Sequence, residues 1–379
     1  MEIYLVGGAV RDLLLGKVPH DLDYAFLGDA ANFKHLYPKA KQVSKSHPTF
    51  ILKGAEYTEV EGHCLESDLA RRDLTINALA LDSQGRLIMH QKALADLKQK
   101  ILRPASETAI LDDPLRVYRL ARFQAQWPEY SVAEEALGQI KKLPKAKLAQ
   151  LAPERVGNEL RKAMLSPRPD LFFSFLAETD CLKPWFAELE LAGTITAGPP
   201  PWHHESVLEH SLELMRQVAG DELAVWMALC HDLGKITTPK DLLPHHYGHE
   251  QRGKALVEVM VKRLRLPTSY LKAGRLICLE HMRGGRLLTL RIGTRRDLVW
   301  TVGNSGLADH FWKVVDADSN SQLSAEAKHE LAILKEVKLP LNFQNQGLRS
   351  QERLRELQCQ ALIMKGVKPE KSKTKRAQS

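Results

Sequence analysis

The sequence predicts an α+β fold in which a head with a small mixed β-sheet comes first and an all-α region follows. Short β-type runs occur within the first hundred residues, at 3–6, 23–27, 50–53 and 57–60. After residue 101 the apolar residues recur at helical spacing, and β-type runs become scarce. A Pro/Gly-rich stretch at 193–201 then separates two helical blocks.

Length and composition narrow the class of protein. The 379 residues are enough for two or three domains at roughly 150 residues each. The 54 Lys and Arg exceed the 46 Asp and Glu, which predicts an anionic partner. No apolar run approaches the roughly 18 residues that span a bilayer, and Glu2 and Asp12 lie where a signal peptide would be basic and apolar. We therefore expect a cytoplasmic protein with no membrane partner, and its five scattered cysteines fit reduced thiols.

The first element is a strand followed by a glycine turn. The apolar run 3–6 leads into Gly7-Gly8 and then into a helical segment, 9–16, that ends in glycine. Residues without a Cβ let an anion approach the backbone, and the free N–H groups at a helix start attract phosphate. Gly8 and Arg11 are therefore candidate phosphate contacts. A purely structural strand-to-helix turn also uses glycine, so the turn alone leaves both interpretations open.

The next element begins with two carboxylates. Asp21 and Asp23 are two residues apart at the start of the β-type run 23–27, and residues i and i+2 of a strand share a face. Their mutual repulsion is costly unless a cation lies between them. Mg²⁺ prefers one or two carboxylates together with phosphate oxygens and water. The pair thus indicates a magnesium site beside the glycine turn, although a solvated Asp-x-Asp turn has the same sequence.

These residues resemble a known family. The pairing of G-G-A-V-R-D at 7–12 with D-L-D at 21–23 resembles the nucleotidyltransferase superfamily, and it is most similar to class II tRNA nucleotidyltransferases and bacterial poly(A) polymerases. Residues 69–80 resemble the family's R-R-D-x-T-x-N-A motif, which contacts ribose and phosphates. Residues 112–123 resemble its E-D-x-x-R-x-x-R-x-x-R-F helix. The resemblance covers roughly the first 165 residues.

The resemblance implies an activity and roles for individual residues. An RNA 3′ hydroxyl would attack the α-phosphate of CTP or ATP, with Mg²⁺ held by Asp21 and Asp23 as the catalytic carboxylates. Asp113 and Arg116 would read the Watson–Crick edge of the incoming base in place of a nucleic-acid template. The further nucleotide-binding residues would be Gly8, Arg11, Arg72, Arg119 and Arg122. Glu59 is a weaker candidate for an additional carboxylate. The partner would be tRNA, held by its phosphates on a basic helical surface.

Three departures from the family bear on which nucleotides are added. Only twelve positions separate Glu59 from Arg71 (71 − 59), where CCA-adding members carry a longer flexible loop. Residues 89–94 lack the Asp and glycines of the family's hinge motif, and Asp112 replaces a Glu. The loop and hinge are linked to the switch from CTP to ATP. We therefore favour a CC-adding enzyme, with a separate A-adding partner, over a complete CCA-adding enzyme.

The second helical block resembles an HD phosphohydrolase domain. The segment 231–235 reads H-D-L-G-K, and histidines precede and follow it. In that family His and Asp side chains from separate helices bind one or two divalent metals. The resemblance implies His210, His231 and Asp232 as ligands, with His246 and His249 next, for Ni²⁺ or another divalent ion. Met282 follows His281 where the family has an Asp, so we expect that ligand to be missing.

The predicted domains are a catalytic head at 1–110, a helical neck and body at 111–192, an HD-type domain at 200–345 and a disordered basic tail at 365–379. Active HD relatives act on 2′,3′-cyclic phosphate, 2′-nucleotide and phosphate substrates. Two further hypotheses remain open: an HD phosphohydrolase with the head as an RNA-binding module, and an RNA-binding protein without catalysis. The retained pair Asp21 and Asp23 argues against the second of these.

Overall fold

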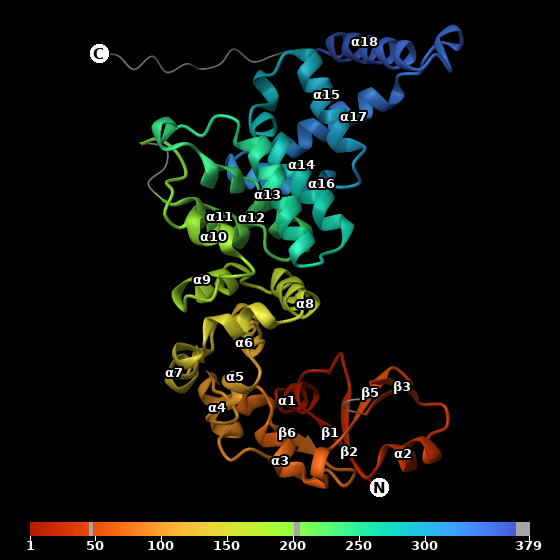
Figure 1. Ribbon diagram of the computed structural model, residues 1–379. Helices are drawn as coiled ribbons and strands as arrows, with labels where there is room; N and C mark the ends of the chain where they lie inside the picture. Colours follow the sequence, from red (N-terminus) through yellow and green to blue (C-terminus); the bar gives the residue numbers. More distant parts are fainter. Residues whose placement is uncertain (45–47, 201–204, 369–379) are drawn as a thin grey trace. The chain divides into compact units, whose positions relative to one another are not determined.

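The computed structural model describes residues 1–44, 48–200 and 205–368, and the chain forms two compact units. The first unit comprises Met1–Leu151 with Glu178–Cys181, and the second comprises Ala152–Ala177 and the chain from residue 182 onward. All named strands lie in the first unit, and the second unit is helical (Figure 1). The predicted α+β class, with the sheet first, is confirmed.

A seven-stranded mixed sheet is the core of the first unit. Its strand order is β3-β4-β5-β2-β1-β6-β7. Strands β2 and β5 run parallel, and the other neighbouring pairs are antiparallel. The strands are β1 (Glu2–Val6), β2 (Asp23–Leu27), β3 (Lys41–Ser44), β4 (Thr49–Leu52), β5 (Ala55–Glu59), β6 (Leu79–Leu81) and β7 (Leu87–Met89).

The pairing of β1 with β2 determines where the candidate site forms. Leu5 is opposite Tyr24 in this antiparallel pair, so the end of β1 lies beside the start of β2. The glycine turn and the two carboxylates are consequently at the same edge of the sheet. Successive strand residues face opposite sides, so Ala25 packs with Val6 in one apolar cluster while Phe26 packs in another. Phe26 stacks on Phe33, with ring centroids 4.4 Å apart.

Helices complete the first unit. They are α1 (Gly8–Leu14), α2 (Ala30–Leu36), α3 (Leu65–Ala70), α4 (Ala93–Gln99), α5 (Ala109–Asp112), α6 (Arg116–Gln126) and α7 (Glu134–Lys142), and β8 (Ile101–Leu102) pairs in parallel with β9 (Ser131–Val132). Helix α6 buries a stripe of apolar residues spaced by three, Val117, Leu120 and Phe123. The arginines that precede each of them form an adjacent ridge, as the sequence predicts.

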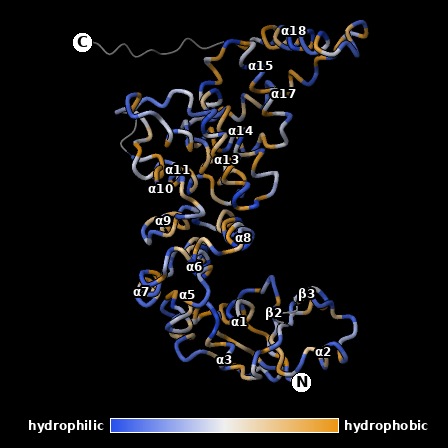
Figure 2. The backbone as a smooth tube through the Cα atoms, in the orientation of Figure 1, coloured by the Kyte–Doolittle hydropathy of each residue, from blue (hydrophilic) through white to orange (hydrophobic). Residues whose placement is uncertain are grey.

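The second unit consists of packed helices. They are α8 (Pro153–Met164), α9 (Asp170–Glu178), α10 (Ala187–Ala192), α11 (Val207–Gln217), α12 (Glu222–Cys230), α13 (His249–Arg263), α14 (Thr268–Gly284), α15 (Ile292–Gly303), α16 (Ala308–Asp318), α17 (Leu323–Glu336) and α18 (Leu348–Met364). Helix α12 is apolar on every side, and it is buried among α11, α14 and α16. Hydrophobic residues gather where α13 and α14 pack (Figure 2).

The unit boundary differs from the expected domain boundary. It falls between Leu151 and Ala152, inside the predicted neck and body. The Pro/Gly-rich stretch lies within the second unit, because hydrogen bonds from Ala197 to Glu205 and from Val207 to Ile195 tie it to the start of α11. Of the predicted tail, residues 369–379 lie outside the described residues. Val367 is buried and bonds back to Leu362 of α18. No helix within the described ranges is long and apolar enough to span a bilayer.

Candidate functional site

The glycine turn between β1 and α1 has a backbone that a larger residue would not adopt readily. Gly7 has a φ of +71°, in the left-handed region. A Cβ at this position would lie 2.8 Å from Nη1 of Arg72. The Gly7 N–H donates to the carbonyl of Leu79 on β6. The turn is therefore held close to the R-R-D-x-T segment, which is expected to contact ribose and phosphate.

A cavity of about 360 Å³ opens beside this turn. Exposed Asp21 and Asp23 both line it, as do Gly8, Arg72 and Arg119. The structure thus brings together two carboxylates, a glycine backbone and several cations, which are the groups that a metal-bound triphosphate requires. Its other lining residues are Gly7, Ala9, Arg11, Asp12, His20, Asp73, Asn77, Arg122, Phe123 and Gln126.

Arg11 is a buried part of the cavity wall with its guanidinium already engaged. Its Nε and Nη2 donate to Oδ1 of Asp12 at 2.9 and 2.7 Å, and its Nη1 donates to Oδ1 of Asn77 at 2.5 Å. The guanidinium also lies over the ring of Trp127, 4.4 Å from the centroid. These contacts anchor Arg11 in the cavity wall, and its expected contact with a phosphate stays a prediction.

Asp73 connects this anchor to helix α6. Its Oδ1 accepts from Nδ2 of Asn77 at 3.0 Å, and its Oδ2 accepts from Nε and Nη2 of Arg119 at 2.9 and 2.6 Å. Burial works to raise the pKa of Asp73, but Arg119 and Asn77 outweigh it and lower the pKa to about 2. Asp73 and Asn77 belong to the R-R-D-x-T-x-N-A motif, but their sequence gives no sign of this buried network.

The predicted base-reading pair is placed differently. Arg119 and Arg122 of the ridge line the cavity, whereas Arg116 and Asp113 do not. Nη1 of Arg116 donates to the carbonyl of Ala109 at 3.0 Å, and its Nη2 donates to the carbonyl of Arg71. Residues spaced by three do not lie exactly above one another on a helix, so Arg116, the first arginine of the ridge, points away from the cavity that Arg119 and Arg122 line.

The weaker carboxylate candidate, Glu59, does not line the cavity. In the parallel pair of β2 and β5 it is opposite Phe26, and the residue opposite Asp23 is Glu56. Burial and the nearby Asp23 raise the pKa of Glu56.

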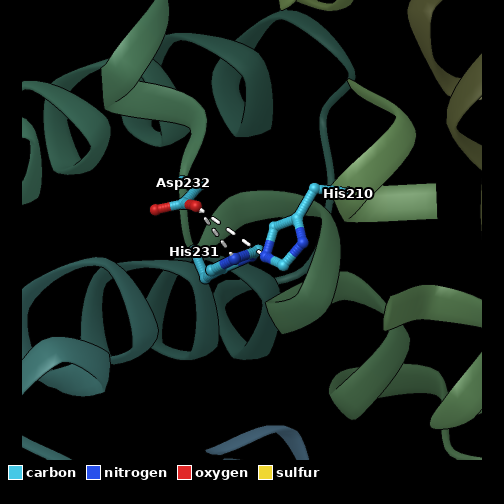
Figure 3. A group of neighbouring side chains, drawn as sticks. All are labelled: His210, His231 and Asp232. Atoms are coloured by element: carbon cyan, nitrogen blue, oxygen red, sulfur yellow. Dashed lines mark ion pairs between the residues drawn. The ribbon is translucent and has the colours of Figure 1, made fainter. Parts of the chain in front are cut away.

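The second unit holds a cluster of histidines and carboxylates from several helices. It contains His210 of α11, His231 and Asp232 after α12, His249 of α13 and His281 of α14. Figure 3 shows His210 and His231 with the Asp232 carboxylate. A Cβ on Gly234 would lie 1.9 Å from the carbonyl oxygen of His249, so only glycine lets the H-D-L-G-K turn approach α13 this closely.

Asp232 is the centre of the cluster. Its Oδ2 lies 3.2 Å from Nε2 of His231 and 4.0 Å from Nε2 of His210. Its Oδ1 lies 3.4 Å from Nε2 of His249 and 3.5 Å from Nε2 of His281. Asp232 Oδ1 and His231 Nε2 are buried and make no hydrogen bond within the described part of the chain. A buried carboxylate oxygen and a buried imidazole nitrogen without hydrogen-bond partners are suitable ligand atoms for a divalent cation, and the carboxylate lies between two sets of imidazoles.

Two expectations about the ligands need correction. His246 does not join the cluster, because its Nδ1 pairs with Oγ1 of Thr238 at 2.8 Å and its Nε2 with the carbonyl of Thr196 at 3.0 Å. His281 joins it instead. The exposed Met282 offers no carboxylate, but Asp318 of α16 lies beside the cluster, with its Oδ1 3.1 Å from Nε2 of His210. A single Asp that is 108 residues from His210 offers no local sequence signal.

Burial and neighbouring charges set the protonation of the cluster. Burial works to raise the pKa of Asp232, but His231 and Lys235 hold it well below its ordinary value. Burial lowers the pKa of His249, and together with His281 it outweighs the nearby charge of Asp232, which acts to raise this pKa. Asp232 is therefore ionised and His249 is neutral at pH 7, which are the forms that bind a metal.

Known protein families match the parts of the chain that contain both sites. The poly(A) polymerase head domain matches residues 3–61 and 52–103, the probable RNA and SrmB-binding site of polymerase A matches 129–192, and the HD domain matches 203–319. The Multifunctional CCA protein of Mannheimia succiniciproducens is 37% identical over 313 residues, 74% of each chain. That of Legionella pneumophila is 33% identical over 368 residues, 89% of this chain and 88% of the relative. The chain belongs to the bacterial class II tRNA nucleotidyltransferases that carry an HD domain.

Solved structures have the same fold. The Thermotoga maritima CCA-adding enzyme complexed with tRNA has a TM-score of 0.65 at 20% identity, over 95% of this chain and 87% of that one. The Bacillus stearothermophilus CCA-adding enzyme in complex with CTP has a TM-score of 0.64 at 20% identity, over 97% and 90%. At this identity the likeness shows the fold. The relatives and the match to the head domain show that this chain is an enzyme, a tRNA nucleotidyltransferase. Head domains and HD domains of these types are both associated with divalent metals.

Proposed function

We propose that the first unit adds cytidine nucleotides from CTP to the 3′ end of tRNA in the cytoplasm. The observation that carries this proposal is the cavity in which Asp21 and Asp23 meet the glycine turn. Two solved structures of the same fold are complexes of CCA-adding enzymes, one with tRNA and one with CTP, which supports the same substrates here. The basic excess of the chain suits an RNA partner bound by its phosphates.

Each group in the cavity has a chemical task. Asp21 and Asp23 would hold Mg²⁺, which supplies a lower pKa for the RNA 3′ hydroxyl and neutralises phosphate charge. Gly7 and Gly8 allow the triphosphate to approach the backbone, and Arg72 offers a cation to it. The ion pair with Asp73 fixes Arg119, so little side-chain entropy is lost when Arg119 contacts a bound nucleotide. Arg122 lies over Phe123, 3.9 Å from the ring centroid, and provides a flat cationic surface.

We propose that addition stops after two cytidines, with a separate enzyme supplying the terminal adenosine. Strand β5 ends at Glu59 and helix α3 begins at Leu65, with only the short 3-10 helix Glu61–His63 between them. This connection leaves no room for the flexible loop associated with the switch to ATP. The relatives named Multifunctional CCA proteins make complete CCA addition the competing proposal.

The test offers purified protein three tRNAs, ending in the discriminator base, in C and in CC, with labelled CTP or ATP. CC-specific addition predicts that the first two substrates are extended to CC and that ATP is not incorporated. Efficient addition of A to the tRNA ending in CC would establish complete CCA addition instead. Absence of any CMP incorporation with Mg²⁺ present would count against the transferase site itself.

For the second unit we propose a metal-dependent phosphohydrolase. The supporting observation is that the buried Oδ1 of Asp232 and Nε2 of His231 make no hydrogen bond within the described residues. The further groups around Asp232 are His210 with Asp318 on one side and His249 with His281 on the other. Ni²⁺, or another divalent ion that accepts imidazole and carboxylate, would be held there and would supply an activated water. Phosphate release from 2′-AMP and opening of a 2′,3′-cyclic phosphate, each measured with and without Ni²⁺, test this activity.

A further inference from the structure

A second cavity adjoins the Asp232 cluster, and nothing in the transferase chemistry uses it. Its volume is about 440 Å³, within the range of roughly 300–1,000 Å³ typical of small-molecule pockets. Lys235 and His249 line the cavity and also contact the cluster. Nζ of Lys235 lies 2.6 Å from Oδ2 of Asp232, and Nε2 of His249 lies 3.4 Å from Oδ1. One end of the cavity therefore lies at the candidate metal site.

Part of the cavity wall is the loop 244–248, which hydrogen bonds hold in place. Arg252 of α13 donates to the carbonyl of Tyr247 at 2.7 Å and to Oγ1 of Thr238 at 3.0 Å. His246 bridges Thr238 and the carbonyl of Thr196. His246 therefore has a structural role: it fixes the loop and is not a metal ligand. The cavity wall is consequently preorganised, and binding would cost little loop ordering.

The loop presents a flat aromatic surface to the cavity. The rings of His245 and Tyr247 stack with centroids 5.7 Å apart and an angle of 20° between their planes. Tyr247 is 70% exposed, although it lines the cavity. An exposed stacked pair at a pocket is suited to a further planar group, and aromatic side chains bind nucleic-acid bases through their faces.

The charges of the cavity favour an anion. Lys235 and Arg286 line it, against one carboxylate, Glu250. Nζ of Lys235 is shared between Asp232 and the carbonyl of Ala197, at 2.6 and 2.7 Å. The Arg286 side chain makes no ion pair or hydrogen bond with any residue in the described ranges, so its guanidinium is available for phosphate.

We infer that this cavity binds the nucleoside of a phosphoester substrate, with its base against Tyr247 and its phosphate between Arg286 and the Asp232 cluster. The inference rests on the proposed phosphohydrolase activity and adds the residues that select the substrate. The ligand is either a free nucleoside monophosphate or the terminal nucleotide of an RNA, since both present the same base, ribose and phosphate. Tyr247 and Arg286 are then specificity residues, and neither contacts the Asp232 cluster.

The experiment uses full-length protein loaded with Ni²⁺ and measures hydrolysis of 2′-AMP. We expect Tyr247→Ala to raise KM about tenfold, the size expected when one base loses its stacking partner. Tyr247→Phe should restore most of this loss because it keeps the ring. Val259→Ala, at an exposed position of α13 outside the cavity, is the control for substitution as such. Thermal melting and Ni²⁺ content of each variant show whether the cluster is intact.

Two inhibitors separate the contributions of base and phosphate. Inhibition by adenosine should weaken in Tyr247→Ala and persist in Arg286→Gln, whereas inhibition by inorganic phosphate should weaken in Arg286→Gln and persist in Tyr247→Ala. An RNA oligonucleotide ending in a 2′,3′-cyclic phosphate, run beside 2′-AMP, distinguishes the two sources of ligand. If Tyr247 or Arg286 has only a structural role, its substitution should weaken inhibition by adenosine and by phosphate together.

The outcomes distinguish this inference from the activity on which it rests. If the wild-type protein hydrolyses 2′-AMP while Tyr247→Ala leaves KM and adenosine inhibition unchanged, the cavity is not the nucleoside site and the phosphohydrolase proposal stands. If the wild-type protein hydrolyses no phosphoester, the phosphohydrolase proposal fails. Calorimetric titration of the Ni²⁺-loaded protein with 2′-AMP then decides the inference, since binding that Tyr247→Ala weakens supports it and absence of binding overturns it.

Discussion

Asp73 is a buried carboxylate that fixes Arg119 at the transferase cavity. Its pKa of about 2 lies below the ordinary value of 3.8, so its ionised form stabilises the fold above about pH 4, and that stabilisation is lost as the pH falls toward 2. At pH 7 we expect Asp73→Asn to lower the unfolding free energy of the first unit by about 2 kcal/mol. The difference from the wild-type protein should shrink between pH 4 and 2. Hydrogen exchange of amides in the first unit measures it.

The control is Glu61→Gln, because Glu61 forms an exposed ion pair with Arg71 and such pairs contribute little. A difference between Asp73→Asn and wild type that stays constant from pH 7 to 2 would mean that the charge of Asp73 does not stabilise the fold. CMP incorporation by Asp73→Asn at pH 7 adds a second readout. Its KM for CTP should rise if Arg119 depends on Asp73 for its position.

Individual residues were predictable where the chemistry is local in sequence. Asp21 and Asp23 are two residues apart where β2 begins, and His231 and Asp232 are adjacent. Each pair is therefore close in space because it is close in sequence. Asp318 joins His210 only through the packing of α16 against α11 and α12, which no spacing in the sequence reveals. Met282 follows His281 in the sequence, but the next residue on a helix points to a different side, so this adjacency does not place a ligand.

At the scale of elements, Gly234 allows the close approach of the H-D-L-G-K turn to α13. We expect Gly234→Ala to destabilise the second unit by at least about 2 kcal/mol, since the new methyl group would overlap the carbonyl of His249 and could be accommodated only by separating the two segments. Separation moves His249 away from Asp232, so Ni²⁺ affinity should fall as well. Isothermal titration with Ni²⁺ and hydrogen exchange in the second unit measure both effects.

Gly138→Ala on α7 is the matched substitution, because a Cβ there meets no atom within 4 Å. Alanine in a helix interior is favoured over glycine by up to about 1 kcal/mol, so this variant should be slightly more stable than wild type. Wild-type Ni²⁺ affinity and stability in Gly234→Ala would show that the turn and α13 are not packed as described.

The strands were predictable only in part. The runs at 3–6, 23–27, 50–53 and 57–60 are rich in apolar, aromatic or β-branched residues and correspond to β1, β2, β4 and β5. Strand β3 has no apolar alternation, with largely exposed residues, and β6 and β7 have three residues each. Their pairing comes from neighbouring strands, so their own sequences carry little signal. The parallel pairing of β2 with β5 is likewise a property of the whole sheet.

At the scale of the whole molecule, the two proposed activities belong to separate units. Replacing His231 and Asp232 together with Ala should abolish phosphoester hydrolysis, because the central carboxylate and one imidazole are removed from the cluster. CMP incorporation should remain near the wild-type rate, because neither residue belongs to the first unit. Both activities are measured on the same preparation. Loss of incorporation from a variant that is still folded would mean that the two units do not work independently.

Metal binding offers a second test of this separation. Added Ni²⁺ should protect amides of the second unit from hydrogen exchange by linkage to folding, and it should leave the first unit nearly unchanged. The double variant at His231 and Asp232 should show no such protection. If Ni²⁺ protects the amides of the double variant as strongly as those of the wild type, the ion binds at a site other than the Asp232 cluster.

The central claim is that Asp21 and Asp23, beside the glycine turn, perform nucleotide transfer to tRNA. The most direct measurement is incorporation of labelled CMP into tRNA that lacks its CCA end, with Asp21→Asn and Asp23→Asn compared with wild type in Mg²⁺. Each variant keeps the size of the side chain and removes a charged ligand, so we predict at least a hundredfold loss of rate, about 3 kcal/mol, with tRNA binding unchanged. Incorporation within severalfold of wild type in both variants would contradict the claim.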